Sequence, residues 1–307
     1  MLGIVNAPDT KELIALKDFP EPEASANEVI IEVKTFSLNR GEMSLLKMRP
    51  ADWRPGQDIA GVVVKAAEDG SGPANGARVV ALVDQAGWSQ RVAAPIARVA
   101  ELPADVSFAA AATLPVAGLT ALGAVRYGGF LLGKHVLITG ANGGVGRFAV
   151  QLAALSGAEV TAVSSKARYA VDLSELGAST VIASVHEATD HFELILEGVG
   201  GTSLGETLKL IAPEGTIVLY GTSSQENPAV GLFSFGGHAN ARIQSYFVYG
   251  TGEPAHVSSD LALLAGLVAA GKVQAPVGRE ASWHDLAQGV SALSARQIAG
   301  KVIFNVD

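Results

Sequence analysis

The stretch from His135 to Val150, HVLITGANGGVGRFAV, constrains the fold of this chain most directly. A short apolar run that breaks into glycines and then into a second apolar run predicts a buried strand, a turn and a helix from Val145 to Ser156. In a doubly wound domain, phosphates bind at the first turn of this kind, on backbone N–H groups at the helix N-terminus. The stretch therefore predicts a nucleotide-binding α/β domain.

The alternation of strands and helices extends from about residue 115 to residue 250. The run AEVTAVSS predicts a second strand, and residues 167–176 predict a second helix that Gly177 ends. Further strands are predicted in STVIA, FELILEGVG and GTIVLYG, with an intervening helix in TSLGETLKLIA. Short apolar strands separated by amphipathic helices indicate a parallel sheet covered on both faces. We expect a doubly wound domain over residues 115–250.

The first 114 residues have a different pattern, with β-rich runs such as EVIIEVKTFSL and IAGVVVKA broken by Pro and Gly. Val29, Ile31 and Val33 alternate with polar neighbours, which is typical of a strand with one face in water. These runs predict a small β-barrel or sandwich. Residues 251–307 predict a buried helix that Gly271 ends and a terminal strand, GKVIFNV. Because a lone strand is unstable, we expect it to join the sheet of the first domain.

Composition narrows the classes of partner. The 307-residue chain is long enough for two domains, and its net charge is −8 without a basic run, which argues against nucleic acid and anionic membranes as partners. The absence of cysteine excludes disulfides and thiolate-bound metals. No apolar stretch is long enough to span a membrane and the N-terminus lacks a signal-peptide pattern, so we expect a cytoplasmic protein.

The glycine turn supplies the candidate phosphate-binding residues. If Gly143 and Gly146 are the second and third glycines of the dinucleotide fingerprint, the first falls on Ala141, whose methyl group requires a slightly wider turn. Gly143 would let the backbone approach the pyrophosphate, and Gly146 would let the helix pack on the strand. The alternative is a tight turn without a ligand. The expected cofactor-binding residues of this turn are Ala141, Asn142, Gly143, Gly144, Val145 and Gly146.

The end of the next strand indicates which dinucleotide binds. NAD-dependent enzymes usually hold the ribose hydroxyls with an acid at this place, where the chain has Ser164 and Ser165, followed by Lys166 and Arg168. Hydroxyl groups and cations suit a 2′-phosphate, which a carboxylate would repel. The alternative is a serine helix cap followed by solvated basic residues. The sequence favours NADPH as the cofactor.

Several motifs recur along the chain in a characteristic order: SLNRGE, GQDIAG, GARVVAL, LPVAGLTA, the glycine turn, LSELGA, EGVGG and GKVIF. In this order and spacing they resemble the zinc-independent quinone oxidoreductases of the medium-chain dehydrogenase/reductase superfamily, nearly from end to end. The resemblance implies a GroES-like β-barrel domain, residues 1–114 and 251–307, and a doubly wound Rossmann domain with a parallel sheet, residues 115–250. It also implies an active cleft between them and a homodimer.

The chain departs from the alcohol dehydrogenases of the same superfamily, which bind catalytic zinc through Cys and His near SLNRGE and GQDIAG. The matching places carry Asn39, Gln57 and Asp58, and no cysteine exists to replace the missing ligands. The histidines form no ligand-like group in the sequence, and we interpret His186 and His191 as surface residues. We therefore expect no metal site.

Three residues are candidates for catalysis. By resemblance, Asn39 corresponds to an Asn that faces the nicotinamide region, although it could equally be a turn residue. Arg40 could donate to a substrate carbonyl, and we expect instead that it pairs with Asp58. Tyr127 is a candidate cofactor or substrate contact and proton donor, with a core aromatic as the alternative. Whether a protein acid or solvent supplies the proton stays open.

Further cofactor contacts are expected beyond the phosphate turn. Thr120 resembles a family position near the nicotinamide carboxamide, against ordinary helix packing as the alternative. Gly221 and Thr222 follow a predicted parallel strand, at the end where ligands bind in such sheets. Phe247 and Val248 follow another strand-like run and are expected along the nicotinamide.

The absence of zinc limits the chemistry. Alcohol oxidation loses its usual means of stabilising an alkoxide, whereas quinones and α,β-unsaturated carbonyls spread the incoming charge themselves. The leading hypothesis is therefore hydride transfer from NADPH to a small-molecule quinone or enone. The alternatives are an enoyl reductase for thioester-bound substrates and an NADPH-binding sensor or structural protein with little turnover. Residues 223–244, with Phe233, Phe235 and His238, are either a substrate-facing loop or a dimer contact.

Overall fold

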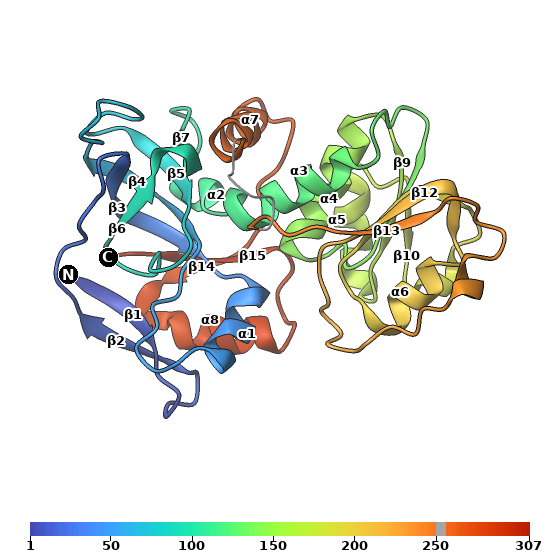
Figure 1. Ribbon diagram of the computed structural model, residues 1–307, viewed down its shortest axis with the longest axis horizontal. Coiled ribbons are helices and arrows are strands. Elements are labelled where there is room, and N and C mark those ends of the chain that lie inside the picture. Colours follow the sequence, from blue (N-terminus) through green and yellow to red (C-terminus); the bar gives the residue numbers. More distant parts are fainter. Residues whose placement is uncertain (250–255) are drawn as a thin grey trace. The chain divides into compact units, whose positions relative to one another are not determined.

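The computed structural model describes residues 1–249 and 256–307, which form two compact units (Figure 1). The first unit comprises residues 1–119 and 256–307, and the second comprises residues 120–249. The sequence placed the first domain boundary a few residues earlier, after residue 114. The other expected boundary, between residues 250 and 251, lies outside the described residues.

The first unit is built on a sheet that is mostly antiparallel. Its strands lie in the order β14 (Val277–Ser282), β15 (Lys301–Asn305), β3 (Glu28–Ser37), β4 (Asp58–Lys65), β5 (Arg78–Leu82) and β7 (Val99–Glu101), and β6 (Arg91–Pro95) also pairs with β3. A separate hairpin joins β1 (Leu2–Asn6) to β2 (Ile14–Asp18). The terminal strand β15 pairs antiparallel with β3, which confirms its expected return to the first unit.

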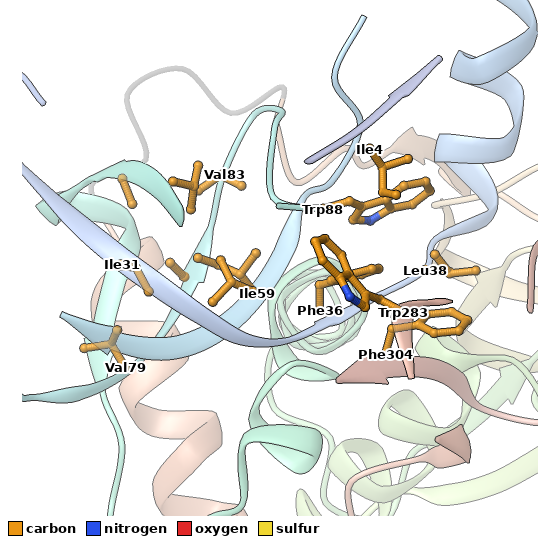
Figure 2. Packing of buried hydrophobic residues seen from close by; sticks show 14 of the residues in the cluster. Ile4, Ile31, Phe36, Leu38, Ile59, Val79, Val83, Trp88, Trp283 and Phe304 are labelled. Atoms are coloured by element: carbon orange, nitrogen blue, oxygen red, sulfur yellow. The ribbon is translucent and has the colours of Figure 1, made fainter. Parts of the chain in front are cut away.

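Alternation along β3 builds the core of this unit. Val29, Ile31 and Val33 are at most 1% exposed, whereas the residues between them are half-buried. Further along the strand, the ring of Phe36 stacks on Trp88 with centroids 5.8 Å apart and lies 5.6 Å from the ring of Phe304 on β15 (Figure 2). Apolar side chains from β3 and from the end of the chain therefore meet in one core, and their burial fixes the register of β15.

The helices of the first unit are α1 (Arg40–Met48), α2 (Phe108–Ala111), α7 (Val257–Ala269) and α8 (Leu286–Ser294), with short helical turns at η1 (Ile96–Arg98), η2 (Leu114–Gly118) and η6 (Trp283–Asp285). The expected apolar helix is α7, but it is not fully buried. Leu261 and Leu264 are buried, whereas Leu263 is 46% exposed. Gly271, with a φ of +65°, lies just after its end.

The second unit contains a parallel six-stranded sheet. Its order is β10 (Thr180–Ile182), β9 (Glu159–Val163), β8 (His135–Ile138), β11 (Phe192–Glu197), β12 (Ile211–Leu219) and β13 (Arg242–Ser245). Every pairing in this sheet is parallel, which confirms the doubly wound prediction. The chain runs outward from β8 to β10, then returns to β11 on the other side of β8. The switch point between β8 and β11 is where such sheets bind ligands.

The helices of the second unit are α3 (Leu119–Arg126), α4 (Gly144–Leu155), α5 (Ala170–Glu175) and α6 (Gly201–Thr207), with short turns η3 (Ala167–Tyr169), η4 (Val185–Glu187) and η5 (Leu232–Phe235). The prediction of a helix through residue 212 was wrong, because α6 ends at Thr207. Ile211 is fully buried and begins β12, where it pairs with Phe192. Among the described residues, no helix combines the length and apolar character needed to cross a membrane.

Candidate functional site

The turn between β8 and α4 differs from the expected fingerprint in its first glycine. The left-handed residue of the turn is Gly140, with a φ of +61°, one position before Ala141. Ala141 is fully buried, and its backbone N–H donates to the carbonyl oxygen of Val163 at 3.2 Å. The turn therefore accommodates the alanine methyl because the strained position belongs to a neighbouring glycine.

The other two glycines of the turn have different surroundings. A Cβ atom on Gly146 would lie 2.5 Å from the carbonyl oxygen of Gly140 and 2.6 Å from the Cα of Ala141. A Cβ on the exposed Gly143 would lie 3.4 Å from the same oxygen, an ordinary contact. Gly146 thus permits the close approach of α4 to the turn. Gly144 and Val145 form the first turn of α4, whose N–H groups lack intrahelical acceptors and suit a phosphate.

Ser164 connects this turn to the end of β9. It is 4% exposed, and the Asn142 side-chain amide donates to its hydroxyl over 2.5 Å. The Oδ1 atom of Asn142 is buried and has no hydrogen-bond partner among the described residues. The buried Ser164 hydroxyl therefore links the turn after β8 to the turn after β9 by a hydrogen bond, and it is largely shielded from solvent.

The basic residues that follow lie at the surface. Ser165 and Arg168 are exposed, and Lys166 is half-buried. The Arg168 guanidinium lies 4.7 Å from the centre of the Tyr169 ring and donates to the Tyr169 hydroxyl at 2.9 Å. Residues 164–169 contain no carboxylate, so the charged side chains of this segment are the cations Lys166 and Arg168.

Hydrogen bonds join the turns on both sides of the switch point. The Thr139 hydroxyl, at the end of β8, accepts from the backbone N–H of Gly198 at 2.9 Å. The Tyr220 hydroxyl, after β12, donates to the carbonyl oxygen of Thr139 at 3.1 Å. The ends of β8, β11 and β12 are thereby held together at the carboxyl edge of the sheet, where the phosphate turn also lies.

Glu197, the last residue of β11, organises the next turn. Its fully buried carboxylate accepts from the N–H groups of Val199 and Gly200 at 2.7 and 2.9 Å and from the Ser203 hydroxyl at 3.0 Å. Burial raises the pKa of Glu197, although these hydrogen bonds oppose the shift. Burial, and to a lesser degree the charge of Glu197, also raises the pKa of Tyr220. The sequence analysis did not assign a role to Glu197, although it quoted its motif, EGVGG.

The other predicted cofactor contacts of this unit follow the parallel strands or lie on α3. A Cβ on Gly221 would lie 3.1 Å from the carbonyl oxygen of Gly198, so the turns after β11 and β12 pack backbone against backbone. Thr222 is exposed. After β13, Phe247 is 68% exposed and Val248 is 8% exposed. Thr120 lies on α3 and is 6% exposed, as a packed helix residue would be. Their contacts with a cofactor stay predictions.

Tyr127 does not lie with the phosphate turn. It follows α3, contacts the Tyr246 ring edge-on at 6.1 Å and lines a cavity of about 390 Å³ together with Lys134, Glu193 and Arg242. Those three residues lie at or next to the first residue of a parallel strand, at the edge of the sheet opposite the phosphate turn. In the loop before β13, Phe233 is 96% exposed, whereas His238 Nδ1 lies 2.6 Å from the carbonyl oxygen of Ile211.

The first unit contains a buried polar cluster at the ends of β3 and β15. Asp58 is fully buried, and its Oδ2 atom accepts from the Ser37 hydroxyl at 2.7 Å, from Asn39 Nδ2 at 2.9 Å and from Lys301 Nζ at 2.8 Å. Its Oδ1 atom accepts from the backbone N–H of Val116 at 2.8 Å. Lys301 Nζ also donates to Asn39 Oδ1. These donors satisfy both oxygens of the buried carboxylate.

The expected pairing of Arg40 with Asp58 was wrong. Arg40 is exposed at the start of α1, whereas Lys301, at the start of β15, provides the ammonium that neutralises Asp58. The pairing of β15 with β3 brings Lys301 to this place. Lys301 was not among the predicted site residues, and its only signal in the sequence is a basic residue at the start of the terminal strand, GKVIFNV.

Glu42 is a second buried acid close to this cluster. Its Oε2 atom accepts from the backbone N–H of Asn39 at 2.7 Å, and its Oε1 atom has no partner among the described residues. Burial first, and then the charge of Asp58, raises the pKa of Glu42 to about 8. Glu42 is therefore predominantly protonated at neutral pH, which limits the charge of the cluster to one carboxylate and one ammonium.

The described residues contain no group of three or more histidine, aspartate or glutamate side chains that could hold a metal ion. His186 is 65% exposed in its side chain and lies 3.5 Å from Glu206, and His191 is exposed. Asn39 and Asp58 bond to each other and to Lys301.

The second unit carries a glycine turn at the switch point of its parallel sheet, and the first unit is built on a mainly antiparallel sheet. Two family models match the chain: "Alcohol dehydrogenase GroES-like domain" over residues 25–130 and "Zinc-binding dehydrogenase" over residues 144–265. The chain belongs to the quinone oxidoreductase-like family of the medium-chain dehydrogenase/reductase superfamily, an oxidoreductase family. The expected GroES-like and Rossmann folds are thereby confirmed.

Two relatives illustrate the range of this similarity. The chain is 33% identical over 270 residues to the spectinabilin polyketide synthase system protein NorB of Streptomyces orinoci, which covers 83% of this chain and 12% of NorB. It is 38% identical over 182 residues to the chloroplast envelope quinone oxidoreductase homolog of Arabidopsis thaliana, which covers 53% of this chain and 54% of the relative. The matched segments thus span about half of one relative and a small part of the other.

Solved structures match over nearly the whole chain. Escherichia coli quinone oxidoreductase, complexed with NADPH, has a TM-score of 0.89 at 21% identity, covering 99% of this chain and 100% of that chain. The quinone oxidoreductase of Coxiella burnetii has a TM-score of 0.85 at 24% identity, covering 100% and 99%. At these identities the likeness establishes the fold.

Proposed function

We propose that this protein is an NADPH-dependent oxidoreductase that delivers hydride to a quinone or an α,β-unsaturated carbonyl without zinc. The observation that carries the proposal is the segment after β9, where Ser164 and Ser165 take the place of the acid that an NAD-dependent enzyme would use and the cations Lys166 and Arg168 follow. The NADPH complex of the structurally similar Escherichia coli enzyme supports it.

The residues of the second unit fit a dinucleotide. Gly143 and the first turn of α4, residues 144–146, would bind the pyrophosphate through backbone N–H groups. The buried Asn142 Oδ1 atom, which lacks a partner among the described residues, is an acceptor that a bound ligand could satisfy. Ser165, Lys166 and Arg168 would hold the 2′-phosphate. NADPH, when bound, supplies the hydride, and Thr120, Gly221, Thr222, Phe247 and Val248 would orient its nicotinamide end.

The polar cluster of the first unit supports chemistry without a metal. Asp58 cannot offer its carboxylate to a metal without losing its hydrogen bonds to Lys301, Ser37 and Asn39. A quinone or enone needs only a hydrogen-bond donor near the oxygen that gains negative charge. Asn39 Nδ2 and the exposed Arg40 guanidinium are the proposed donors, and solvent supplies the proton.

A second candidate function is enoyl reduction on a thioester-bound substrate. The observation in its favour is the 33% identity to NorB, a polyketide synthase system protein, over 270 residues. Purified, metal-analysed protein should be mixed with NADPH or NADH and with a simple quinone, an enone or an enoyl thioester, while reduced-nucleotide absorbance is followed. Consumption of the reduced nucleotide with a quinone or an enone supports quinone or enone reduction. Its consumption with the thioester alone supports enoyl-thioester reduction. Tight NADPH binding without turnover on any acceptor would instead indicate a sensor or structural protein.

Arg168→Ala is expected to weaken NADPH binding roughly ten- to hundredfold while changing NADH binding little, because one charge-assisted bond to the 2′-phosphate is lost. Titrations of both nucleotides measure the difference. Arg242→Ala is the matched control, since Arg242 is an exposed arginine that begins β13, away from the phosphate turn. Equal weakening of NADPH and NADH by Arg168→Ala would refute the proposed contact.

A homodimer in the cytoplasm is part of the proposal. The edge strand β13 pairs only with β12 within the described chain. The backbone N–H and C=O groups on its other edge are therefore available to pair with a second copy of the chain. The mass of the protein in solution tests the dimer.

A further inference from the structure

We propose that Lys301 is a positioning residue, which fixes the side-chain amide of Asn39 so that one Nδ2–H remains to donate to the electron acceptor. This inference rests on the proposed function, because it assigns Asn39 to the acceptor oxygen. It adds a residue from the last strand of the chain to the machinery of the first unit.

The contacts of Asn39 determine the orientation of its amide. The Lys301 ammonium has only donors, so the Asn39 atom that it contacts must be the carbonyl oxygen. Asp58 is an ionised acceptor, so the Asn39 atom 2.9 Å from its Oδ2 must be the amide nitrogen. A half-turn of the amide would set its NH2 group against the ammonium and its oxygen against the carboxylate. Lys301 and Asp58 together therefore permit one orientation.

The partners of Asn39 are themselves fixed. Lys301 is 4% exposed and lies 2.8 Å from Asp58, which three further donors hold. The backbone of Lys301 is also anchored, because its N–H donates to the carbonyl oxygen of Pro276 at 2.7 Å. The preceding residue, Gly300, has a φ of +74°, and a Cβ there would lie 2.2 Å from the same oxygen. The turn before β15 thus delivers the ammonium to one place.

Asn39 is the member of the cluster that reaches the surface. It is 9% exposed, compared with 4% for Lys301, whereas Ser37, Glu42 and Asp58 are fully buried. One Nδ2 hydrogen is bound by Asp58, and the other is left for a ligand. The ammonium on Oδ1 polarises the amide and makes this remaining N–H a better donor. The cluster therefore offers one oriented donor that is accessible to a ligand.

The test is a double-mutant cycle between Lys301→Met and Asn39→Ala with saturating NADPH and the best acceptor. Each single variant is expected to lower kcat roughly tenfold or more, as for the loss of an oriented donor, and to leave the Kd of NADPH unchanged. The double variant is expected to be no slower than Asn39→Ala, because Lys301 acts through Asn39. Lys301→Arg should restore part of kcat. The proposal would be overturned if the two losses of kcat multiply in the double variant, or if kcat is unchanged in Lys301→Met.

Lys301→Met leaves Asp58 buried without its ammonium, so a second variant guards against misfolding. The pair Asp58→Asn with Lys301→Met removes both charges and should retain the fold, because replacing a buried ion pair is tolerated better than breaking it. It should still lower kcat. Fluorescence of the three tryptophans, all in the first unit, reports whether each variant is folded.

A measurement that does not depend on turnover separates this inference from the proposed function. With selective ¹⁵N-asparagine labelling, the two Asn39 side-chain NH2 signals are identified by their loss in Asn39→Ala, and the hydrogen bound by Asp58 should exchange slowly with water in the parent protein. That hydrogen should exchange rapidly in Lys301→Met. Fast exchange in the parent protein would refute the fixed amide even in an active enzyme. Slow exchange in a protein that turns over no acceptor would refute the proposed function alone.

Discussion

Gly146→Ala is expected to destabilise the second unit by about 3 kcal/mol and to weaken NADPH binding on the order of a hundredfold or more. The new methyl carbon would lie 2.5 Å from the carbonyl oxygen of Gly140 and 2.6 Å from the Cα of Ala141, and both are backbone atoms. No side-chain rotation can relieve these contacts. The N-terminus of α4 must therefore move away from the turn, which separates the N–H groups proposed to bind the pyrophosphate.

Gly143→Ala is the matched control for this substitution. The φ of Gly143 is −73°, which alanine adopts readily, and its Cβ would lie 3.4 Å from the Gly140 oxygen. We expect an unchanged melting temperature but weaker nucleotide binding, because the methyl group covers the exposed face of the turn. Far-UV circular dichroism and NADPH titration measure the two effects. Normal melting and normal affinity in Gly146→Ala would contradict the packing argument.

Local patterns predicted the architecture of both units. Val29, Ile31 and Val33 recur at every second position, with Glu28, Glu32 and Lys34 among their neighbours, and the observed β3 buries them on one face. The apolar strands and amphipathic helices of residues 135–219 predicted the parallel sheet, because both signals depend on residues close together in sequence. The end of α6 was missed because Leu208 and Ile211 fit a helical pattern as well as a buried strand.

Contacts between distant residues could not be predicted in this way. Asp58 and Lys301 are 243 positions apart, and Asn39 and Lys301 are 262 positions apart. The expected partner of Asp58 was Arg40, which follows Asn39 directly in the sequence. The structure instead selects Lys301, because the pairing of β15 with β3 determines which cation meets the carboxylate. The register of β15 against β3 thus determines which charged side chains meet in the cluster.

The phosphate turn was predictable in outline but not in its strained residue. Counting back from Gly143 and Gly146 placed the first glycine on Ala141, whereas Gly140 adopts the left-handed conformation. The sequence likewise did not predict that Ser164, an expected cofactor contact, is buried and accepts a hydrogen bond from Asn142. Both differences arise because spacing gives the order of residues in a turn but not their dihedral angles.

Glu42→Gln is expected to remove a pH dependence from the stability of the first unit. Burial raises the pKa of Glu42 from 4.5 to about 8, so the folded state keeps a proton that the unfolded state has lost. The folded protein therefore binds more protons than the unfolded chain between these values, and the free energy of unfolding falls as pH rises through this window. A shift of this size corresponds to a loss on the order of 4 kcal/mol between about pH 4.5 and about pH 8.

Glutamine stays neutral throughout this range, so the variant should lack that loss. Its buried amide adds a donor where Glu42 Oε1 already lacks a partner among the described residues. We therefore expect the free energy of unfolding to be lower by about 1–3 kcal/mol at every pH in this range. The diagnostic quantity is therefore the slope of unfolding free energy against pH. Urea titrations followed by tryptophan fluorescence measure it selectively, because Trp53, Trp88 and Trp283 all lie in the first unit.

Asp69→Asn is the control for the slope. Asp69 is an exposed acid of the same unit, and hydrogen bonds from Ser71 lower its pKa below 3.8. A lowered pKa contributes stability that is lost only as pH falls through the folded value, so Asp69→Asn leaves the slope between about pH 5 and about pH 8 unchanged. A Glu42→Gln variant with the slope of the parent protein would show that Glu42 is ionised in the folded state. The cluster would then hold two carboxylates against the single ammonium of Lys301, and Asn39 would be oriented by a different balance of charge.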